Sequence, residues 1–193
     1  MSFAIPECSV SQRAVSILTE YGISMLKYMG HNFCHFAMIY TNCGKTVKVY
    51  SYGYNHIRSK RSIHAEVDAI NNLPPVRRKK KLVKVKLLVI RISRGKLKLA
   101  ESRCCVRCCE SIYRVPPLRG YTIENVAFSN DCGCVEDHHP ISLLIDDDYH
   151  VSVYYSKRNY HPKIRDRVIS HPNPKVKLFI RKKEETDTES ESD

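Results

Sequence analysis

Residues 62–73 read Ser62-Ile63-His64-Ala65-Glu66-Val67-Asp68-Ala69-Ile70-Asn71-Asn72-Leu73. Ile63, Val67 and Ile70 recur at helical spacing, so the segment predicts a short amphipathic helix that begins near His64. This helix is expected to end before the Pro74-Pro75 pair, because proline lacks the backbone N–H that a helix interior needs. A histidine and a glutamate, two residues apart, therefore lie at the start of a helix.

A second predicted helix start carries a cluster of cysteines. The motif is Cys104-Cys105-Val106-Arg107-Cys108-Cys109, and a helix is expected from Cys105 to Arg114, stopped by the Pro116-Pro117 pair. Cysteines three residues apart at a helix start lie on one face, about one turn from each other, and can hold one ion. The free N–H groups and partial positive charge of a helix N-terminus also stabilise thiolates.

Together the two helix starts offer the ligands of a zinc site. A catalytic zinc takes three protein ligands and leaves its fourth position to water, and His64, Cys105 and Cys108 meet that count. Glu66 diverges from His64 by roughly 200° around a helix, so its carboxylate can hang over the open position and move protons.

The remaining segments predict the elements around these helices. A helix is expected within residues 9–29, capped by Ser9 or Ser11, and short helices at Ile141–Asp146 and His150–Ser156. Five strands are expected at residues 33–40, 46–54, 82–93, 121–129 and 134–136. The short Asn130–Gly133 turn makes the last two strands an antiparallel hairpin, because a parallel crossover needs a dozen or more residues. The predicted fold is a three-layer α/β/α domain with a five-stranded mixed sheet.

Length and charge bound the organisation of the chain. Its 193 residues predict one domain at 1–169 and an extended tail at 170–193 that is basic, then acidic, and disordered. Residues 1–183 hold all 32 Lys and Arg but only 14 of the 20 Asp and Glu, which leaves a formal charge of +18. Such a body attracts phosphates, on a nucleotide or along a nucleic acid. The run at 77–81 suits a solvated loop or a targeting signal at least as well as nucleic acid.

Composition also bears on the compartment. No run of about 18 apolar residues occurs, so no membrane span is predicted. Residues 1–7 have neither the basic start nor the apolar stretch of a secretory signal. Nine cysteines, an odd count, then favour reduced thiols with metal or catalytic roles. We expect an intracellular protein of the cytoplasm or nucleus that is not secreted.

Over residues 9–156 the chain resembles the cytidine and deoxycytidylate deaminase superfamily. Gly53-Tyr54-Asn55 followed by the His-Ala-Glu helix is similar to the strand-end asparagine and H-A-E helix of that family. Residues 101–108, Glu-Ser-Arg-Cys-Cys-Val-Arg-Cys, are similar to its S-x-P-C-x-x-C segment, and residues 126–130 to its fourth strand.

The resemblance implies a role for each matching residue. His64, Cys105 and Cys108 would bind Zn²⁺. Glu66 would shuttle protons, and Asn55 would contact the substrate sugar. Beside these motifs, Arg103 and Arg107 are basic residues that can bind a phosphate or a strand backbone, and Tyr54 can stack on a base.

One position departs from the family pattern. Cys104 stands where a proline normally precedes the first ligand cysteine. Proline presets φ at a first helical position, so its loss loosens the ligand turn. The register is then open, because Cys104 with Cys108, or Cys105 with Cys109, are spaced alternatives. The x₂ spacing of the family favours Cys105 and Cys108.

The other histidines and cysteines have structural interpretations. Cys132-Gly133-Cys134 with His138-His139 favours a thiol-bearing turn over a second metal site, because glycine between two cysteines fits a hairpin. His31, Cys34 and His35 are expected to be packing and polar edge residues.

The predicted activity is zinc-dependent hydrolytic deamination of a cytosine-containing nucleotide of the CMP or dCMP type. It would release ammonia and a uracil product. Two alternatives remain: a deaminase acting on RNA or single-stranded DNA, and a catalytically silent, zinc-stabilised relative that binds nucleic acid or protein. Beyond the nucleotide or nucleoside substrate, nucleic acid on the basic surface and a homo-oligomer stay open as partners, and no membrane partner is expected.

Overall fold

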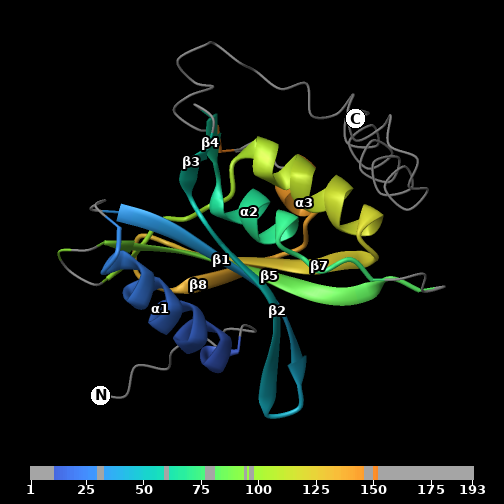
Figure 1. The fold of residues 1–193 in the computed structure, drawn as a ribbon, viewed down its shortest axis with the longest axis horizontal. Coiled ribbons are helices and arrows are strands. Elements are labelled where there is room, and N and C mark those ends of the chain that lie inside the picture. The colour runs from blue at the N-terminus through green and yellow to red at the C-terminus, as the bar shows by residue number, and fades with distance from the viewer. Residues whose placement is uncertain are drawn as a thin grey trace, which may run out of the picture.

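The computed structural model describes residues 11–29, 33–58, 61–76, 81–93, 95, 98–145 and 150–151 (Figure 1). The predicted tail at 170–193 and residues 152–156 of the last predicted helix lie outside this set, and His150 and Val151 are not helical. Among the described residues, every helix is too short or too polar to span a membrane.

Five strands form the path of an open mixed sheet in the order β2-β1-β5-β7-β8. They are β1 (Phe33–Cys43), β2 (Thr46–Tyr54), β5 (Val83–Ser93), β7 (Tyr121–Ser129) and β8 (Val135–His138). β5 and β7 run parallel, and the other neighbours on this path are antiparallel. The mixed α/β class is confirmed. A sixth strand, β6 (Leu99–Ala100), pairs with β5, and its two residues are too few to leave a periodic signal in the sequence.

The last two strands form the predicted antiparallel hairpin. Gly133 has φ +81°, a left-handed conformation that glycine adopts without steric cost. Its N–H donates to Asn130 O at 3.0 Å, and Asn130 N donates to Cys134 O at 2.9 Å. β8 begins directly after this turn, at Val135, with no helix between the two strands.

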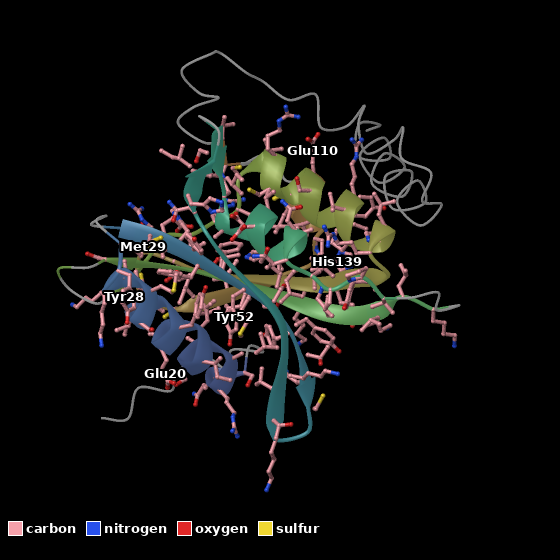
Figure 2. The ribbon with its side chains drawn as sticks, viewed as in Figure 1. Glu20, Tyr28, Met29, Tyr52, Glu110 and His139 are labelled. Atoms are coloured by element: carbon pink, nitrogen blue, oxygen red, sulfur yellow. The ribbon has the colours of Figure 1, made fainter. Side chains whose placement is uncertain are left out.

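Helices lie on both faces of the sheet (Figure 1). They are α1 (Gln12–Leu26), α2 (Ala65–Asn71), α3 (Val106–Leu118) and α4 (Ser142–Ile145). β1 contributes Phe36 and Met38 to the core under α1, and Ala37 and Ile39 to the core under α2 and α3. Side chains fill both interfaces (Figure 2). Because successive strand residues point to opposite faces, an apolar run such as β5 supplies two cores at once.

Three local features differ from the expectations. α3 continues through Pro116 and Pro117, because their φ suits a helix and their carbonyls still accept from the N–H groups of Arg119 and Gly120, at 2.9 and 3.1 Å. Ser11 is the N-cap of α1 but makes no side-chain capping bond. Before α2, β3 (His56–Arg58) and β4 (Arg61–Ile63) form a separate two-stranded sheet that the sequence analysis misses.

α2 approaches the sheet closely at Gly53 of β2. A Cβ atom on Gly53 would lie 2.2 Å from Ala69 N and 2.3 Å from Ala65 O, so only glycine fits at this point. Beside it, Ser51 Oγ donates to Ala69 O at 2.8 Å. These contacts hold α2, whose N-cap is His64, against β2.

Candidate metal centre

Three ligand atoms converge where α2 and α3 begin. His64 Nδ1 lies 3.5 Å from Cys105 Sγ and 3.3 Å from Cys108 Sγ, and the two sulfurs are 3.6 Å apart. Elsewhere in the described part of the chain, no three His, Cys, Asp or Glu side chains bring their ligand atoms this close together. The triad that the sequence predicts is therefore a group that could hold a metal ion.

The separations in this triad match the edges of a tetrahedral zinc site. Bonds of about 2.3 Å to sulfur and about 2.0–2.1 Å to nitrogen place two ligand sulfurs about 3.8 Å apart, and a sulfur and a nitrogen about 3.5 Å apart. The observed distances of 3.6, 3.5 and 3.3 Å lie close to these values. Thiolate and imidazole ligands also suit zinc, whereas Ca²⁺ and Mg²⁺ prefer oxygen. The residues present fit this metal.

Both helix starts present their ligand in the same way. His64 is the N-cap of α2, with φ −79° and ψ 153°, and Cys105 is the N-cap of α3, with φ −73° and ψ 157°. Their carbonyls accept the first helical bonds, from Asp68 N and Cys109 N, each at 3.0 Å. Neither side chain caps its own helix, so both can turn toward the same point.

A pair of buried serines holds the segment that leads to Cys105. Ser102 Oγ donates to Val89 O at 2.9 Å and accepts from Ser129 N at 2.9 Å. Ser102 N donates to Ser129 O at 2.8 Å. These bonds tie the approach to α3 to β5 and to the end of β7.

The doubled cysteines divide into two pairs with different surroundings. Cys105 and Cys108 face His64, whereas Cys109 Sγ lies 3.8 Å from Cys104 O. Cys104 shares a side-chain hydrogen bond with Glu66. Neither of the alternative pairings forms a converging group among the described residues.

The two facing thiols share one negative charge. The pKa of Cys105 falls to about 4, first because the Cys108 thiol donates a hydrogen bond to its thiolate, and further through His64. As the donor of that bond, and because it is buried, Cys108 has a pKa well above its usual value. The hydrogen bond with Cys105 raises the pKa of His64. Thiols and imidazole must be deprotonated to bind zinc, so metal binding here would release protons.

A cavity of about 390 Å³ opens beside the triad. It is lined by residues of the strands β1, β4 and β5, of both helix starts and of the loops between these elements: His35, Asn55, Ser62, His64, Ala65, Glu66, Arg91, Glu101, Arg103, Cys105 and His150. The lining residues differ in how deeply they are buried. Ala65, Glu66 and Cys105 are buried, whereas Ser62 and His150 are exposed. The base of the cavity therefore lies at the ligands, and its mouth at Ser62 and His150.

Glu66 is the buried acid at the base of the cavity. Its side chain is 5% exposed, and its carboxyl pKa is raised, first by burial and then by the charge on Cys105. The hydrogen bond with Cys104 acts in the opposite direction. A carboxyl with a raised pKa beside a metal site can accept a proton and return it near neutral pH.

Asn55 lines the cavity, and its side-chain oxygen is already used. Asn55 Oδ1 accepts from His35 N at 2.7 Å and from Cys34 Sγ at 2.9 Å. Asn55 N in turn donates to His35 O at 3.2 Å. The carboxamide is thus fixed against β1, while its Nδ2 makes no hydrogen bond within the described residues.

The other three predicted substrate residues divide between the cavity and its surroundings. Arg103 lines the cavity, and its backbone N–H donates to Glu101 Oε1 at 2.9 Å. Tyr54 and Arg107 are not among the lining residues. Tyr54 packs against the core under α1, and Arg107 makes an ion pair with Glu110 at 3.3 Å. Substrate contact by these residues stays a prediction.

His35 is the main cavity residue that the sequence analysis misses. Expected as a packing or edge residue, it lines the cavity, and its pKa falls to about 4 because of burial and then the nearby Arg91. His35 and Arg91 are cross-strand partners on β1 and β5. Only this long-range pairing brings them together, and the one local signal is a histidine between the buried Cys34 and Phe36.

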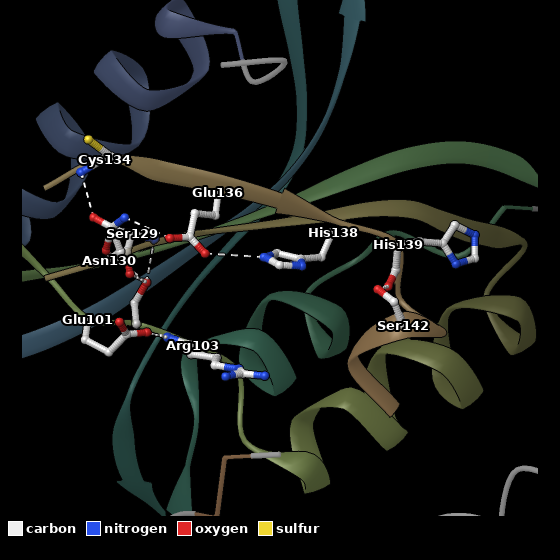
Figure 3. Close-up of polar contacts among 10 residues, drawn as sticks. Glu101, Arg103, Ser129, Asn130, Cys134, Glu136, His138, His139 and Ser142 are labelled. Carbon is white, nitrogen blue, oxygen red and sulfur yellow. Dashed lines mark hydrogen bonds and ion pairs between the residues drawn. The ribbon is translucent and has the colours of Figure 1, made fainter. Parts of the chain in front are cut away.

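The second cluster of cysteines and histidines does not converge. Cys132 and Cys134 are exposed on the β7–β8 turn. The His138 ring stacks on Phe128, with centroids 4.8 Å apart, and His138 Nε2 lies 3.5 Å from Glu136 Oε2 (Figure 3). Nothing in this described region gathers three ligand atoms, in agreement with the predicted thiol-bearing turn.

Comparison with protein-family models finds no match, and comparison with curated proteins finds no significant relative.

Proposed function

We propose that this protein is a zinc-dependent hydrolytic deaminase that acts on a cytosine-containing nucleotide of the CMP or dCMP type. The observation that carries the proposal is the convergence of His64, Cys105 and Cys108 at tetrahedral-zinc separations, with the carboxyl of Glu66 buried beside them in one cavity. When zinc is bound in such a site, it would lower the pKa of its water ligand.

Glu66 has the chemistry of the proton shuttle that hydrolysis at C4 of cytosine requires. It would accept a proton from the attacking water, deliver one to ring nitrogen N3, and pass one to the departing amine, which leaves as ammonia. The raised pKa of its carboxyl supports this role, because the protonated form is then accessible during turnover.

The rest of the cavity supports a nucleotide as the substrate. Asn55 Nδ2 can donate to a sugar oxygen, and the guanidinium groups of Arg91 and Arg103 can balance a phosphate. The helices on both faces of the mixed sheet support the three-layer deaminase-like arrangement that the sequence resemblance implies.

The test is ammonia release from the zinc-loaded full chain, with cytidine, adenosine and their monophosphates as substrates. We expect activity on a cytosine monophosphate, and a loss of about 10²–10⁴-fold in Glu66→Gln, which removes general acid–base catalysis. Zinc content should stay near one ion per chain. Glu124→Gln is the matched control, because Glu124 pairs with Lys84 on the sheet, outside the cavity lining.

The alternatives give different results in the same assay. Inert mononucleotides with deamination of single-stranded RNA or DNA would point to a polynucleotide deaminase. Bound zinc with no deamination of any substrate would point to a silent relative. Full activity in Glu66→Gln would refute the role of Glu66.

A further inference from the structure

His150, which follows α4 in the chain, lies beside the candidate metal centre and lines its cavity. His150 O accepts a hydrogen bond from Val106 N at 2.9 Å. Val106 is the first residue of α3 and the neighbour of the ligand Cys105. This bond satisfies one of the free N–H groups that every helix start exposes, so it has a structural reason to form.

The element that precedes His150 in the chain, α4, packs on the same core as the candidate metal centre. Leu143 of α4 is buried in the core under α2 and α3, and its N–H donates to His139 O at 3.4 Å. Only four residues separate the end of α4 at Ile145 from His150. His150 is thus close in the sequence to a helix that packs on the core, and its backbone carbonyl is bonded to the start of α3.

His150 and Ser62 are the two exposed residues of the cavity lining. Glu66 and Cys105 at the base are buried, His35 and Arg103 are half-buried, and His150 is exposed. A ligand that presents a reacting carbon to Glu66 must place its opposite end at the mouth. For a nucleoside monophosphate with C4 of the base beside Glu66, that opposite end is the phosphate.

The charges near the mouth favour a phosphate. Arg91 and Arg103 are two cationic residues of the lining, and Glu101 is the acid at the same half-buried level. One oxygen of Glu101 is held by the backbone N–H of Arg103. The neutral imidazole of His150 has one N–H group. At the mouth it can donate a hydrogen bond to a phosphate oxygen, and the imidazole does not have to be protonated to do so.

We propose that His150 is a specificity-determining residue of this cavity, which contacts the phosphate of a bound nucleoside monophosphate and so favours nucleotides over nucleosides. The inference rests on the proposed function for the direction in which the base lies. Recognition of the phosphate is a role that neither the candidate metal ligands nor Glu66 would fulfil.

A substitution of His150 gives a clean test, because the anchor to Val106 uses the backbone carbonyl and not the side chain. We would measure binding of CMP and cytidine by calorimetry to the zinc-loaded full chain carrying Glu66→Gln, which prevents turnover. His150→Ala should reduce the preference for CMP over cytidine about tenfold, almost all of it through weaker CMP binding. His150→Gln, which keeps an N–H donor, should retain part of the preference.

Arg114→Ala is the control for a general charge effect, since Arg114 is an exposed cation of α3 outside the lining. It should leave the preference unchanged. Equal weakening of both ligands in His150→Ala, an unchanged preference, or no preference in the parent protein would overturn the inference.

These outcomes are separable from those of the proposed function. An active wild-type enzyme whose preference ignores His150 keeps the deaminase and removes this contact. A protein that releases no ammonia but loses its CMP preference in His150→Ala keeps the contact and removes the deaminase.

Discussion

The core under α2 and α3 packs four cysteines, Cys104, Cys105, Cys108 and Cys109, among its apolar residues, whereas the core under α1 contains one, Cys34. Both cores are built by the same strands. Leu87 and Val89 of β5 lie in the first core, and Leu88 and Ile90 lie in the second.

The difference between the faces comes from the helix starts and not from the strands. α2 and α3 both begin at the cavity, and their N-cap side chains point into one site. No residue of α1 lines the cavity. Because side chains alternate along each strand, one sheet supports two different faces: a structural face under α1, and a chemical face under α2 and α3 that carries the candidate metal centre. The same kind of substitution, made once on each face, should therefore separate effects on stability from effects on metal binding.

The largest expected effect is the loss of zinc in Cys105→Ser. Even partners that only orient a ligand change metal affinity about 10–100-fold, so removal of a ligand should weaken zinc binding more than about 100-fold, or about 2.7 kcal/mol. Metal analysis after dialysis and a zinc competition titration would measure it.

Cys109→Ser is the matched control for that change. Its hydroxyl can donate to Cys104 O as the thiol does, and Cys109 does not face His64. It should keep about one zinc per chain. Loss of zinc in both variants would favour the alternative pairing of Cys105 with Cys109, and retention of zinc in both would favour the pairing of Cys104 with Cys108.

A pair of glycines offers the next largest contrast. Gly53→Ala would drive a Cβ to 2.2–2.3 Å from the α2 backbone atoms Ala69 N and Ala65 O. Because a helix backbone must then move away from β2, we expect more than about 3 kcal/mol of destabilisation and weaker zinc binding. Urea unfolding monitored by circular dichroism, with zinc content, would test both.

Gly22→Ala is the counterpart on the other face. Its Cβ would meet the side-chain atoms Ile92 Cδ1 and Phe36 Cδ2 at 2.6 and 2.8 Å, whereas the Cβ at Gly53 would meet backbone atoms. Alanine also gains about 1 kcal/mol in helix propensity. The net change should stay within about 1 kcal/mol with zinc binding intact. Equal effects at Gly22 and Gly53 would contradict the distinction between the faces.

Local periodicity predicts most of this fold. The helix at Gln12–Leu26, the β1–β2 hairpin, strands β5 and β7 and the glycine turn before β8 all follow from spacing and turn chemistry. The three residues of the candidate metal centre are also predictable. Each lies at or near the start of a helix whose sequence carries its own signal: a proline pair after the first helix, and cysteines one turn apart in the second.

The cavity walls are not predictable in the same way. His35 and Arg91 meet only through the antiparallel register of β1 and β5, and His150 lies at the cavity, where its carbonyl accepts a hydrogen bond from Val106 N at the distant start of α3. Such contacts depend on tertiary packing, which leaves no period in the sequence. The same holds for β6, whose two residues pair with β5.

The third prediction concerns the pH dependence of the chemical face. The pKa of His35 is about 4 in the folded chain, against an ordinary 6.5. Folding therefore favours the neutral imidazole, so this contribution to stability is complete above pH 6.5 and is lost as the pH falls toward 4. At about 1.4 kcal/mol per pKa unit, it is on the order of 3 kcal/mol.

His35→Gln should flatten the decline of unfolding free energy between pH 6.5 and 4 relative to wild type. Urea unfolding at several pH values in this window would measure the difference. His56→Gln, a histidine change outside the cavity lining, should keep the wild-type decline. Parallel curves for His35→Gln and wild type would show that burial of His35 is not coupled to its protonation.

The smallest contrast lies within the chemical face itself, between two buried serines. Ser102 Oγ bonds to Val89 O and Ser129 N on the approach to α3, whereas Ser51 Oγ makes one bond, to Ala69 O in the second half of α2. Ser102→Ala leaves a buried donor and a buried acceptor without partners, which costs about 2 kcal/mol, against about 1 kcal/mol for Ser51→Ala. Because Ser102 lies two residues before the first cysteine of the segment, its loss should also weaken zinc binding, while Ser51→Ala should not. If zinc competition titrations give the same affinity for both variants, the bonds of Ser102 stabilise the sheet without positioning Cys105.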